Sequence, residues 1–470
     1  MGKAKRLFNG DAEQTLYKRV TPSQEQRDFL QTQWNALADH LRAQLFRNGY
    51  PVSTWIQGSY KYGTLIKPVR YGEEYDVDLG VYFEWEAGGV ELEPTPGQLR
   101  DWVQRELVIY KGLNSDVKEI TEPKERCSRA IYSKRFHIDT PTYHLDPRRD
   151  RRRLATLSGE WEVSDPKAFY KWFKAALNGA ERDQVRRLIR YLKGWAALAF
   201  ENAPDARPSS IFLTVLTTRI YEGAWFDRLS ELDDDDALIL VIKKMHERLV
   251  DDRDVCNPID SQEQLNRISK EAWPSFLTRL TALRDCAEDA EAAQDEPAAA
   301  MAWTEAFSFL MPLPEGDEIE VAESETSTAL MQIPDVKIEV ATDADFKDVL
   351  ADHINEVPSV ARKRWLRFTI LNSAIVPNMA HIEWTVRNDG TEAEFLGDLG
   401  HASGGIGAFS VTETTAYAGK QYMDLVIRCN GTVYAARRIA VYIDGNLTTQ
   451  GPKATTRAWM KLRSRRTSRR

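Results

Sequence analysis

The chain has 470 residues, against the ~100–200 residues of a usual domain, so one compact domain is improbable and several are expected. Apolar residues make up 42% of the sequence and include 13 tryptophans, which excludes a wholly disordered chain. With 63 basic and 71 acidic residues the formal charge is −8, which argues against a protein that coats duplex nucleic acid. No segment has the ~18 consecutive apolar residues of a membrane span, and the first residues lack the apolar middle of a signal peptide. We therefore expect a soluble cytoplasmic protein with no membrane contact.

The first part of the chain predicts a mixed α/β lobe. Pro22 to Phe46 places apolar side chains at helical spacing, which predicts a long amphipathic helix. Thr54 to Trp85 predicts a strand, a Gly-containing turn and a second strand. Ser128–Tyr132 and Arg135–Asp139 alternate as the two strands of a hairpin do. Residues 1–165 therefore form the first expected domain.

The remainder divides by composition and periodicity. Helical periodicity follows Asp165-Pro166 and predicts a helical lobe, whereas short alternating runs between Asn-Gly turns predict a small antiparallel sandwich further on. The expected boundaries are 166–311 for the helical lobe, 312–360 for an acidic linker, 361–447 for the sandwich and 448–470 for a basic tail. The fold class that these elements predict is α+β.

One constellation of residues predicts chemistry. The stretch Gln57-Gly58-Ser59-Tyr60-Lys61-Tyr62-Gly63-Thr64 has a Gly-Ser turn at a helix start, where backbone N–H groups and a hydroxyl are free to hold phosphate oxygens. Asp76 and Asp78 are two apart on a strand and share a face, which is repulsive unless a divalent cation neutralises them. Asp139, at the end of a later strand, supplies a third carboxylate for a pair of Mg²⁺ ions. Together these features predict phosphoryl-group chemistry on a nucleotide.

Each feature has a simpler interpretation when it stands alone. A Gly-Ser turn is usually a loop, and a DxD pair on a strand is usually a solvated face; only their order and spacing favour function. His137 neighbours Asp139, but we expect it to point to the opposite strand face and to be a packed or surface histidine.

The motif Gln57 to Thr64 followed by Asp76 and Asp78 resembles the nucleotidyltransferases of the polymerase-β-like fold, and specifically the cGAS/DncV-like bacterial enzymes called CD-NTases. The resemblance continues in the helical lobe, in Trp161 to Pro166, Leu188 to Trp195 and Pro208-Ser209-Ser210. It implies a template-independent enzyme that joins nucleotides with Mg²⁺ (or Mn²⁺) and releases pyrophosphate, commonly making cyclic oligonucleotide signals in anti-phage defence. A product-responsive effector protein is the implied partner.

The resemblance also implies roles for single residues. Asp76, Asp78 and Asp139 are the implied catalytic and metal-binding carboxylates. The implied nucleotide contacts are Gln57, Gly58, Ser59, Lys193, Ser209 and Ser210. Without the resemblance, Lys193 is a surface lysine on an amphipathic helix and Ser209 or Ser210 is a helix N-cap.

The C-terminal segment resembles the adenylyl/guanylyl and SMODS C-terminal sensor domain. Its W-x-V-x-N-x-G-x-x-A pattern is matched by Trp384, Val386, Asn388, Gly390 and Ala393, and it departs from the pattern at Lys420-Gln421, where Gly-His is expected. The resemblance implies sensing, while the Arg-rich end of the chain suggests contact with a nucleic acid or another polyanion.

Besides transfer of one nucleotide to a small molecule or protein, which needs an acceptor pocket that the sequence does not identify, two alternatives to a cyclic product remain at this stage. The same catalytic residues serve an enzyme that makes linear oligonucleotides, and a catalytically weak nucleic-acid or ligand sensor can retain the fold. The intact aspartates Asp76, Asp78 and Asp139 argue against the second.

Overall fold

The computed structural model describes residues 2–70, 72–89, 93–133, 135–225, 231–314, 333–429 and 432–445. The basic tail expected over 448–470 and much of the expected linker lie outside these residues. The described chain divides into two compact units. The first contains residues 1–10 and 15–288, and the second contains residues 11–14 and 289–470.

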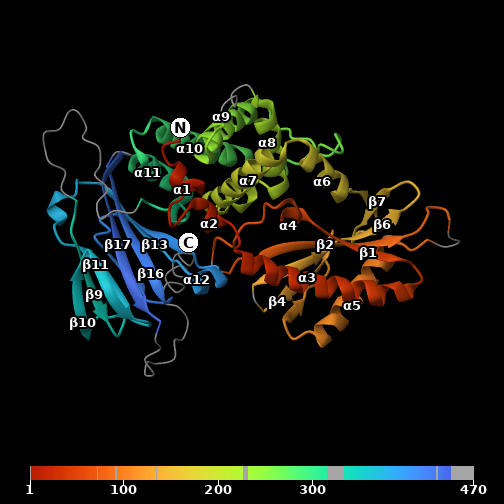
Figure 1. Ribbon diagram of the computed structural model, residues 1–470, viewed down its shortest axis with the longest axis horizontal. Helices are drawn as coiled ribbons and strands as arrows, with labels where there is room; N and C mark the ends of the chain where they lie inside the picture. Colours follow the sequence, from red (N-terminus) through yellow and green to blue (C-terminus); the bar gives the residue numbers. More distant parts are fainter. Residues whose placement is uncertain are drawn as a thin grey trace. The chain divides into compact units, whose positions relative to one another are not determined.

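The first unit contains a mixed eight-stranded sheet (Figure 1), in the order β3-β4-β5-β2-β6-β7-β8 with β1 also paired to β2. The strands are β1 (Val52–Gln57), β2 (Tyr75–Glu84), β3 (Val117–Ile120), β4 (Ser128–Tyr132), β5 (Phe136–Thr140), β6 (Thr142–Asp146), β7 (Arg151–Ala155) and β8 (Trp161–Val163). The hairpin expected from Ser128 to Asp139 is confirmed as β4 with β5. The two strands expected over Thr54 to Trp85 are β1 and β2, but the helix α4 (Gly58–Tyr62) lies between them in place of a simple turn.

Two helices, α3 (Gln24–Leu45) and α5 (Pro96–Leu113), cover one face of this sheet (Figure 1). Both begin with a capping box, from Ser23 with Gln26 and from Thr95 with Gln98. Their leucines pack against Val77, Leu79 and Ile138 of the sheet in one core. Because side chains alternate along a strand, the residues between these apolar ones face the opposite side of the sheet.

The helical part of the first unit follows the sheet. Its elements are α6 (Pro166–Ala175), α7 (Gly179–Ala199), α8 (Ser210–Gly223), α9 (Asp234–Asp251) and α10 (Trp273–Ala292). The short helices α1 (Lys5–Asn9), α2 (Leu16–Val20) and α4 (Gly58–Tyr62) also contact this unit, α2 against α7 and α4 against β2. The described residues also include the 3-10 turns η1 (Phe46–Asn48), η2 (Pro204–Ala206), η4 (Ser308–Leu310) and η5 (Ser373–Ile375). None of the described helices combines the length and the apolar character needed to cross a membrane.

The second unit is a two-sheet sandwich preceded by α11 (Glu296–Phe307). One sheet has the order β10-β9-β12-β15 and the other β11-β17-β16-β13-β14, and the unit also contains the short helix α12 (Thr391–Phe395). The strands are β9 (Val336–Ala341), β10 (Val349–Ile354), β11 (Glu356–Ala361), β12 (Trp365–Ile370), β13 (His381–Arg387), β14 (Gly400–Ile406), β15 (Ser410–Thr414), β16 (Gly419–Cys429) and β17 (Thr432–Asp444). Trp384 lies fully buried in its core.

The sandwich begins earlier than the sequence analysis expects. β9, β10 and β11 lie largely inside the range 312–360 that was assigned to a linker. The reason is the alternation of Val336, Ile338 and Val340, which are all buried in the sandwich core. In addition, α11 lies in the second unit, although the expected helical lobe extends to residue 311.

Candidate active site

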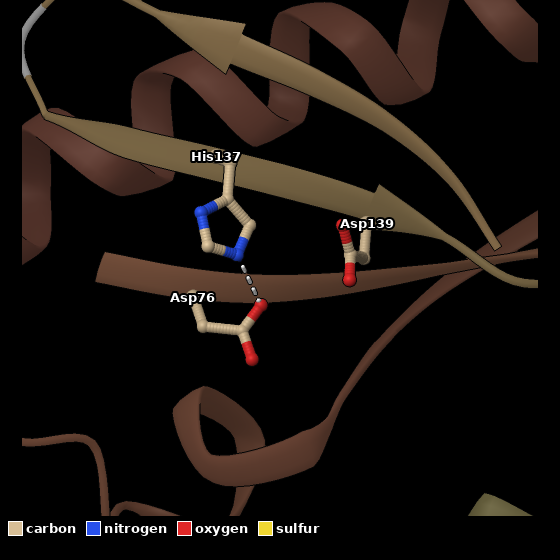
Figure 2. A group of neighbouring side chains, drawn as sticks. All are labelled: Asp76, His137 and Asp139. Atoms are coloured by element: carbon tan, nitrogen blue, oxygen red, sulfur yellow. Dashed lines mark hydrogen bonds and ion pairs between the residues drawn. The ribbon is translucent and has the colours of Figure 1, made fainter. Parts of the chain in front are cut away.

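Three carboxylates and one imidazole lie close together on the sheet face that α3 and α5 do not cover. β2 and β5 are parallel neighbours, and their register places Asp76 beside His137 and Asp78 beside Asp139. Figure 2 shows Asp76 on one strand and His137 with Asp139 on the next, all projecting to the same side. One ligand atom from each of Asp76, His137 and Asp139 lies within 4.8 Å of the others.

The expectation for His137 is wrong. His137 and Asp139 are two residues apart on β5, so they share a strand face. The imidazole Nε2 lies 2.9 Å from Asp76 Oδ1, and Nδ1 lies 2.9 Å from Glu74 Oε2. His137 therefore belongs to the same cluster of side chains as Asp76 and Asp139.

Asp139 also has a basic neighbour. Arg129 on β4 lies opposite Asp139 in the antiparallel register of β4 and β5. Its guanidinium donates from Nε to Asp139 Oδ1 at 2.5 Å and from Nη2 to Oδ2 at 2.7 Å. This two-point ion pair fixes the orientation of the Asp139 carboxylate.

The electrostatics of the two β2 aspartates differ. Burial, followed by the charges of Asp76 and Asp139, raises the pKa of Asp78 to about 8. Burial also opposes ionisation of Asp76, but the hydrogen bond from His137 and the charges of His137 and Arg129 hold the pKa of Asp76 below its ordinary value. The raised pKa of Asp78 thus reflects burial first, and then the repulsion expected from neighbouring carboxylates.

Gly58 brings the start of α4 against this group. Its φ is +64°, a conformation that glycine adopts easily. A Cβ at this position would lie 1.9 Å from Asp78 Oδ2, so only glycine lets the backbone pass so close to the carboxylate. Ser59 follows directly, and its backbone carbonyl accepts a hydrogen bond from Thr64 N at 2.9 Å.

A cavity of about 300 Å³ lies beside the carboxylates. Its lining includes Ser59, Asp76, Lys193 and Ser210, four residues that the sequence analysis named from separate motifs. The other charged residues that line it are Lys67, Glu73, Glu74 and Arg207. The cavity thus combines an acidic group for cations with basic and hydroxyl groups for anions.

Lys193 is a buried cation in the wall of this cavity. It lies on α7, is 6% exposed, and its Nζ donates to the Thr64 carbonyl oxygen at 3.0 Å. Burial, followed by the charge of Arg190, lowers the pKa of Lys193 to about 7. Because burial disfavours the charged form of this amine, an anion that enters the cavity would stabilise that charged form.

Three of the expected nucleotide contacts, Gln57, Gly58 and Ser209, do not line the cavity. The Gln57 side chain is buried and is held by the hydroxyls of Tyr143 and Tyr82, each at 3.2 Å. Ser209 caps α8, where its Oγ accepts from Phe212 N at 3.3 Å. Ser210, the next residue, is the one of this serine pair that lines the cavity.

The sequence analysis missed several residues of the site. His137 and Arg129 had a usable signal, because residue parity on β5 and the register of the predicted hairpin place both beside the carboxylates. Lys67, Glu74 and Arg207 carry no comparable local signal, since the fold brings them to the cavity from separate segments.

Comparison with known proteins adds two family matches. Residues 52–143 match the model of the cyclic GMP-AMP synthase DncV-like nucleotidyltransferase domain. Residues 320–444 match that of the adenylyl/guanylyl and SMODS C-terminal sensor domain. Both matches agree with the resemblances noted from the sequence.

Similar proteins and structures were also found. A cyclic GMP-AMP synthase of Escherichia albertii is 28% identical over 93% of this chain and 95% of its own length. A c-di-GMP synthase of Roseivirga ehrenbergii is 24% identical over 59% of this chain and 80% of its own length. The crystal structure of Vibrio cholerae DncV cyclic AMP-GMP synthase with nonhydrolyzable GTP aligns with a TM-score of 0.54, at 19% identity, over 67% of this chain and all of that one. This structural likeness confirms the predicted α+β fold.

Proposed function

Since the chain carries a DncV-like nucleotidyltransferase domain and an adenylyl/guanylyl and SMODS C-terminal sensor domain, we propose that it joins nucleoside triphosphates, without a template, into a cyclic oligonucleotide. The reaction forms a phosphodiester bond by attack of a ribose hydroxyl on an α-phosphate, and pyrophosphate leaves. The names of the relatives, cyclic GMP-AMP synthase and c-di-GMP synthase, support a cyclic dinucleotide as the product class.

The observation that supports this proposal best is the composition of the cavity. A nucleoside triphosphate is a polyanion with a reacting phosphorus, so its site needs cations and donors for the phosphates and carboxylates beside the reacting atoms. Lys193, Ser59 and Ser210 supply the first set, and Asp76 lies in the same wall.

The donor set also fits divalent cations. Asp76, Asp78 and Asp139 offer hard oxygen ligands, and the raised pKa of Asp78, due first to burial and then to the charges of Asp76 and Asp139, reflects a repulsion that cations relieve. We propose that these three aspartates hold two Mg²⁺ or Mn²⁺ ions. When bound, such ions make the attacking hydroxyl more acidic and offset charge on the leaving pyrophosphate.

The protein's own residues orient the substrate. Gly58 and Ser59 at the start of α4 donate to phosphate oxygens, with Gly58 allowing the close approach of the backbone to Asp78. Lys193 neutralises the β- and γ-phosphates, and its hydrogen bond to the Thr64 carbonyl oxygen keeps its amine directed at the cavity. Gln57 acts indirectly, because its buried side chain fixes the end of β1.

The biological role belongs to the same proposal. A cyclic oligonucleotide is suited to signalling, and we propose that it activates an effector protein in anti-phage defence. The C-terminal sensor domain then regulates synthesis, and the nucleoside triphosphates are the only substrates required.

The proposal is tested by pyrophosphate release from mixed nucleoside triphosphates. We expect release that depends on Mg²⁺ or Mn²⁺ and that falls at least 100-fold in the variant Asp76→Asn with Asp78→Asn. Asp183→Asn, which changes a 60% exposed carboxylate, is the matched control and should keep full activity. Circular dichroism checks that the double variant is folded. Full activity of a folded double variant would end the nucleotidyltransferase interpretation.

A further inference from the structure

The imidazole of His137 is held by two carboxylates at once. Nδ1 lies 2.9 Å from Glu74 Oε2, and Nε2 lies 2.9 Å from Asp76 Oδ1 on the side of the ring that faces the site. The side chain of His137 is 10% exposed, whereas that of Asp76 is 55% exposed. Figure 2 shows the ring projecting from β5 toward the carboxylate of Asp76, with Asp139 beside it.

This arrangement matches that of histidines that bind metals. Such a histidine commonly donates one ring N–H to a carboxylate, which fixes the tautomer and the ring orientation, and presents its other nitrogen to the metal. Glu74 is positioned for the first task at Nδ1. Nε2 and one oxygen each from Asp76 and Asp139 lie within 4.8 Å of one another, which is close enough for small shifts to bring them around one ion.

His144 shows what a packed histidine looks like in the same sheet. Its Nε2 lies 3.0 Å from the Trp85 carbonyl oxygen, its Nδ1 accepts from Arg153 Nη2 at 2.8 Å, and its ring stacks on Trp85 with centroids 3.8 Å apart. Both nitrogens of His144 are used by structural partners. Both nitrogens of His137 instead meet carboxylates, and one of these belongs to the candidate metal group.

We propose that His137 Nε2 is a metal ligand together with Asp76 and Asp139, that Glu74 orients it, and that this nitrogen ligand makes the site favour Mn²⁺ over Mg²⁺. The proposal rests on the proposed function, which places divalent cations at these aspartates. Mg²⁺ is bound in proteins almost entirely by oxygen, whereas Mn²⁺, although it also favours oxygen ligands, is a transition-metal ion that accepts an imidazole nitrogen more readily than Mg²⁺ does. A site made of carboxylates alone lacks this reason to prefer Mn²⁺ over Mg²⁺.

Pulsed electron paramagnetic resonance of the full chain with Mn²⁺ alone, in the absence of nucleotide, tests the assignment. We expect a ¹⁴N coupling to the bound ion, which changes to the ¹⁵N pattern when the protein is labelled with ¹⁵N-histidine. This arm needs no variant, so it does not depend on the folding of a mutant. Bound Mn²⁺ without a histidine nitrogen coupling would overturn the proposal and leave His137 as a residue that only positions Asp76.

Variants then identify the histidine. His137→Gln should remove the coupling and weaken Mn²⁺ binding about tenfold or more, with little effect on Mg²⁺ binding. Glu74→Gln should weaken Mn²⁺ binding and retain the coupling. His40→Gln is the matched control, since His40 also faces a glutamate, Glu106 at 3.4 Å, but on α3 and α5. A coupling that persists in folded His137→Gln would contradict the assignment.

The outcome separates this proposal from the proposed function. A histidine coupling in a protein that makes no nucleotide product supports the ligand assignment and removes the function. Product formation with Mn²⁺ bound through oxygen alone supports the function and removes the assignment.

Discussion

Asp78 is the aspartate of the site whose ionised form the folded protein disfavours. Its pKa is raised to about 8, first by burial and then by the charges of Asp76 and Asp139, whereas an unfolded aspartate titrates near ~3.9. The folded state therefore disfavours ionised Asp78, and stability is lost as the pH rises from about 4 to about 8. Below about pH 4 the carboxyl is neutral in both states and has no such effect.

We predict that Asp78→Asn raises the melting temperature of the metal-free protein, and that the gain grows from pH 5 to pH 8. The expected gain at pH 8 is of the order of 1 kcal/mol in the free energy of unfolding. Thermal melting in EDTA measures it, with Asp352→Asn, at a 68% exposed side chain, as the control. A gain that is largest at pH 5 would contradict the electrostatic explanation.

Lys193 leads to a second prediction, about protons taken up on binding. Its pKa is lowered to about 7, mainly by burial, so at pH 8 the amine of the free protein is mostly neutral. A bound triphosphate favours the charged form and raises this pKa. Binding at pH 8 should therefore take up a proton, and binding at pH 6 should take up little, because the amine is already charged.

Calorimetry of triphosphate binding in buffers of different ionisation enthalpy, in EDTA, measures this uptake. Lys193→Met should remove the uptake at pH 8 and weaken binding about tenfold or more. Lys171→Met, at an exposed position on α6, should change neither. Equal uptake in wild type and Lys193→Met would show that another group titrates.

Much of the site could be predicted from the sequence at the level of single residues. Asp76, Asp78 and Asp139 needed only strand periodicity, and Lys193 needed a family resemblance because nothing local distinguishes a buried lysine on α7 from a surface one. His137 was misplaced by an error of residue parity. Arg207 and the buried environment that lowers the pKa of Lys193 depend on tertiary packing, which no local pattern contains.

At the scale of elements, the junction of β1 and α4 determines how closely the chain approaches the carboxylates. Gly58 has a φ of +64°, and a Cβ there would lie 1.9 Å from Asp78 Oδ2. Gly49 has a φ of +91° and would meet nothing within 4 Å. An alanine would therefore be strained at both positions, but only at Gly58 would its Cβ also contact Asp78.

We predict that Gly58→Ala lowers activity about tenfold or more, whereas Gly49→Ala leaves it unchanged. Gly49→Ala should lose about 1 kcal/mol of stability, since alanine at positive φ is strained, and Gly58→Ala should lose at least as much, because its Cβ also displaces the Asp78 carboxylate. Initial rates of pyrophosphate release and denaturant unfolding of both proteins measure these effects. Equal activity losses in the two variants would assign the effect of Gly58 to strain and not to its contact with Asp78.

Helices and strands with a strong hydrophobic periodicity could be predicted from the sequence, whereas a strand beside an acidic, Pro-containing segment could not. The expected helix over Pro22–Phe46 is α3, Gln24–Leu45, and its start is set by the capping box of Ser23. β9 was missed because an acidic, Pro-containing segment precedes it and drew the whole range into a linker. The alternation in Val336–Ala341 was present in the sequence, but six residues are a short signal beside such a segment.

At the scale of the whole molecule, two arginines of a buried ion-pair cluster in the sandwich also hold the chain that precedes it, by hydrogen bonds to backbone carbonyls. Asp424 is fully buried between Arg387 and Arg438. Arg387 also donates to the Ser308 carbonyl oxygen at 3.1 Å, and Arg438 donates to that of Leu313 at 2.8 Å. A division of the chain after residue 311 would therefore separate α11 and Ser308 from the unit to which they belong, and α10 is the better place to end a truncated protein.

We predict that a chain ending at Ala292 binds triphosphate and divalent cations as the full chain does, within about threefold. Every residue assigned here to chemistry lies in the first unit, which has its own core. Calorimetry on both proteins measures the affinities, and circular dichroism checks folding. A folded truncated protein that binds no triphosphate would show that the second unit contributes to the site.

The most direct test of the central claim is to identify the product made from labelled nucleoside triphosphates. The full chain is incubated with each triphosphate and with mixtures, in Mg²⁺ and separately in Mn²⁺, and the products are treated with phosphatase and resolved by mass. We predict an oligonucleotide that lacks terminal phosphates, resists phosphatase and has the mass of a cyclic species, and that is absent with Asp76→Asn and Asp78→Asn together. A product that loses terminal phosphates to phosphatase would identify a linear oligonucleotide synthase, and nucleosides alone after phosphatase treatment, under every condition, would contradict the account.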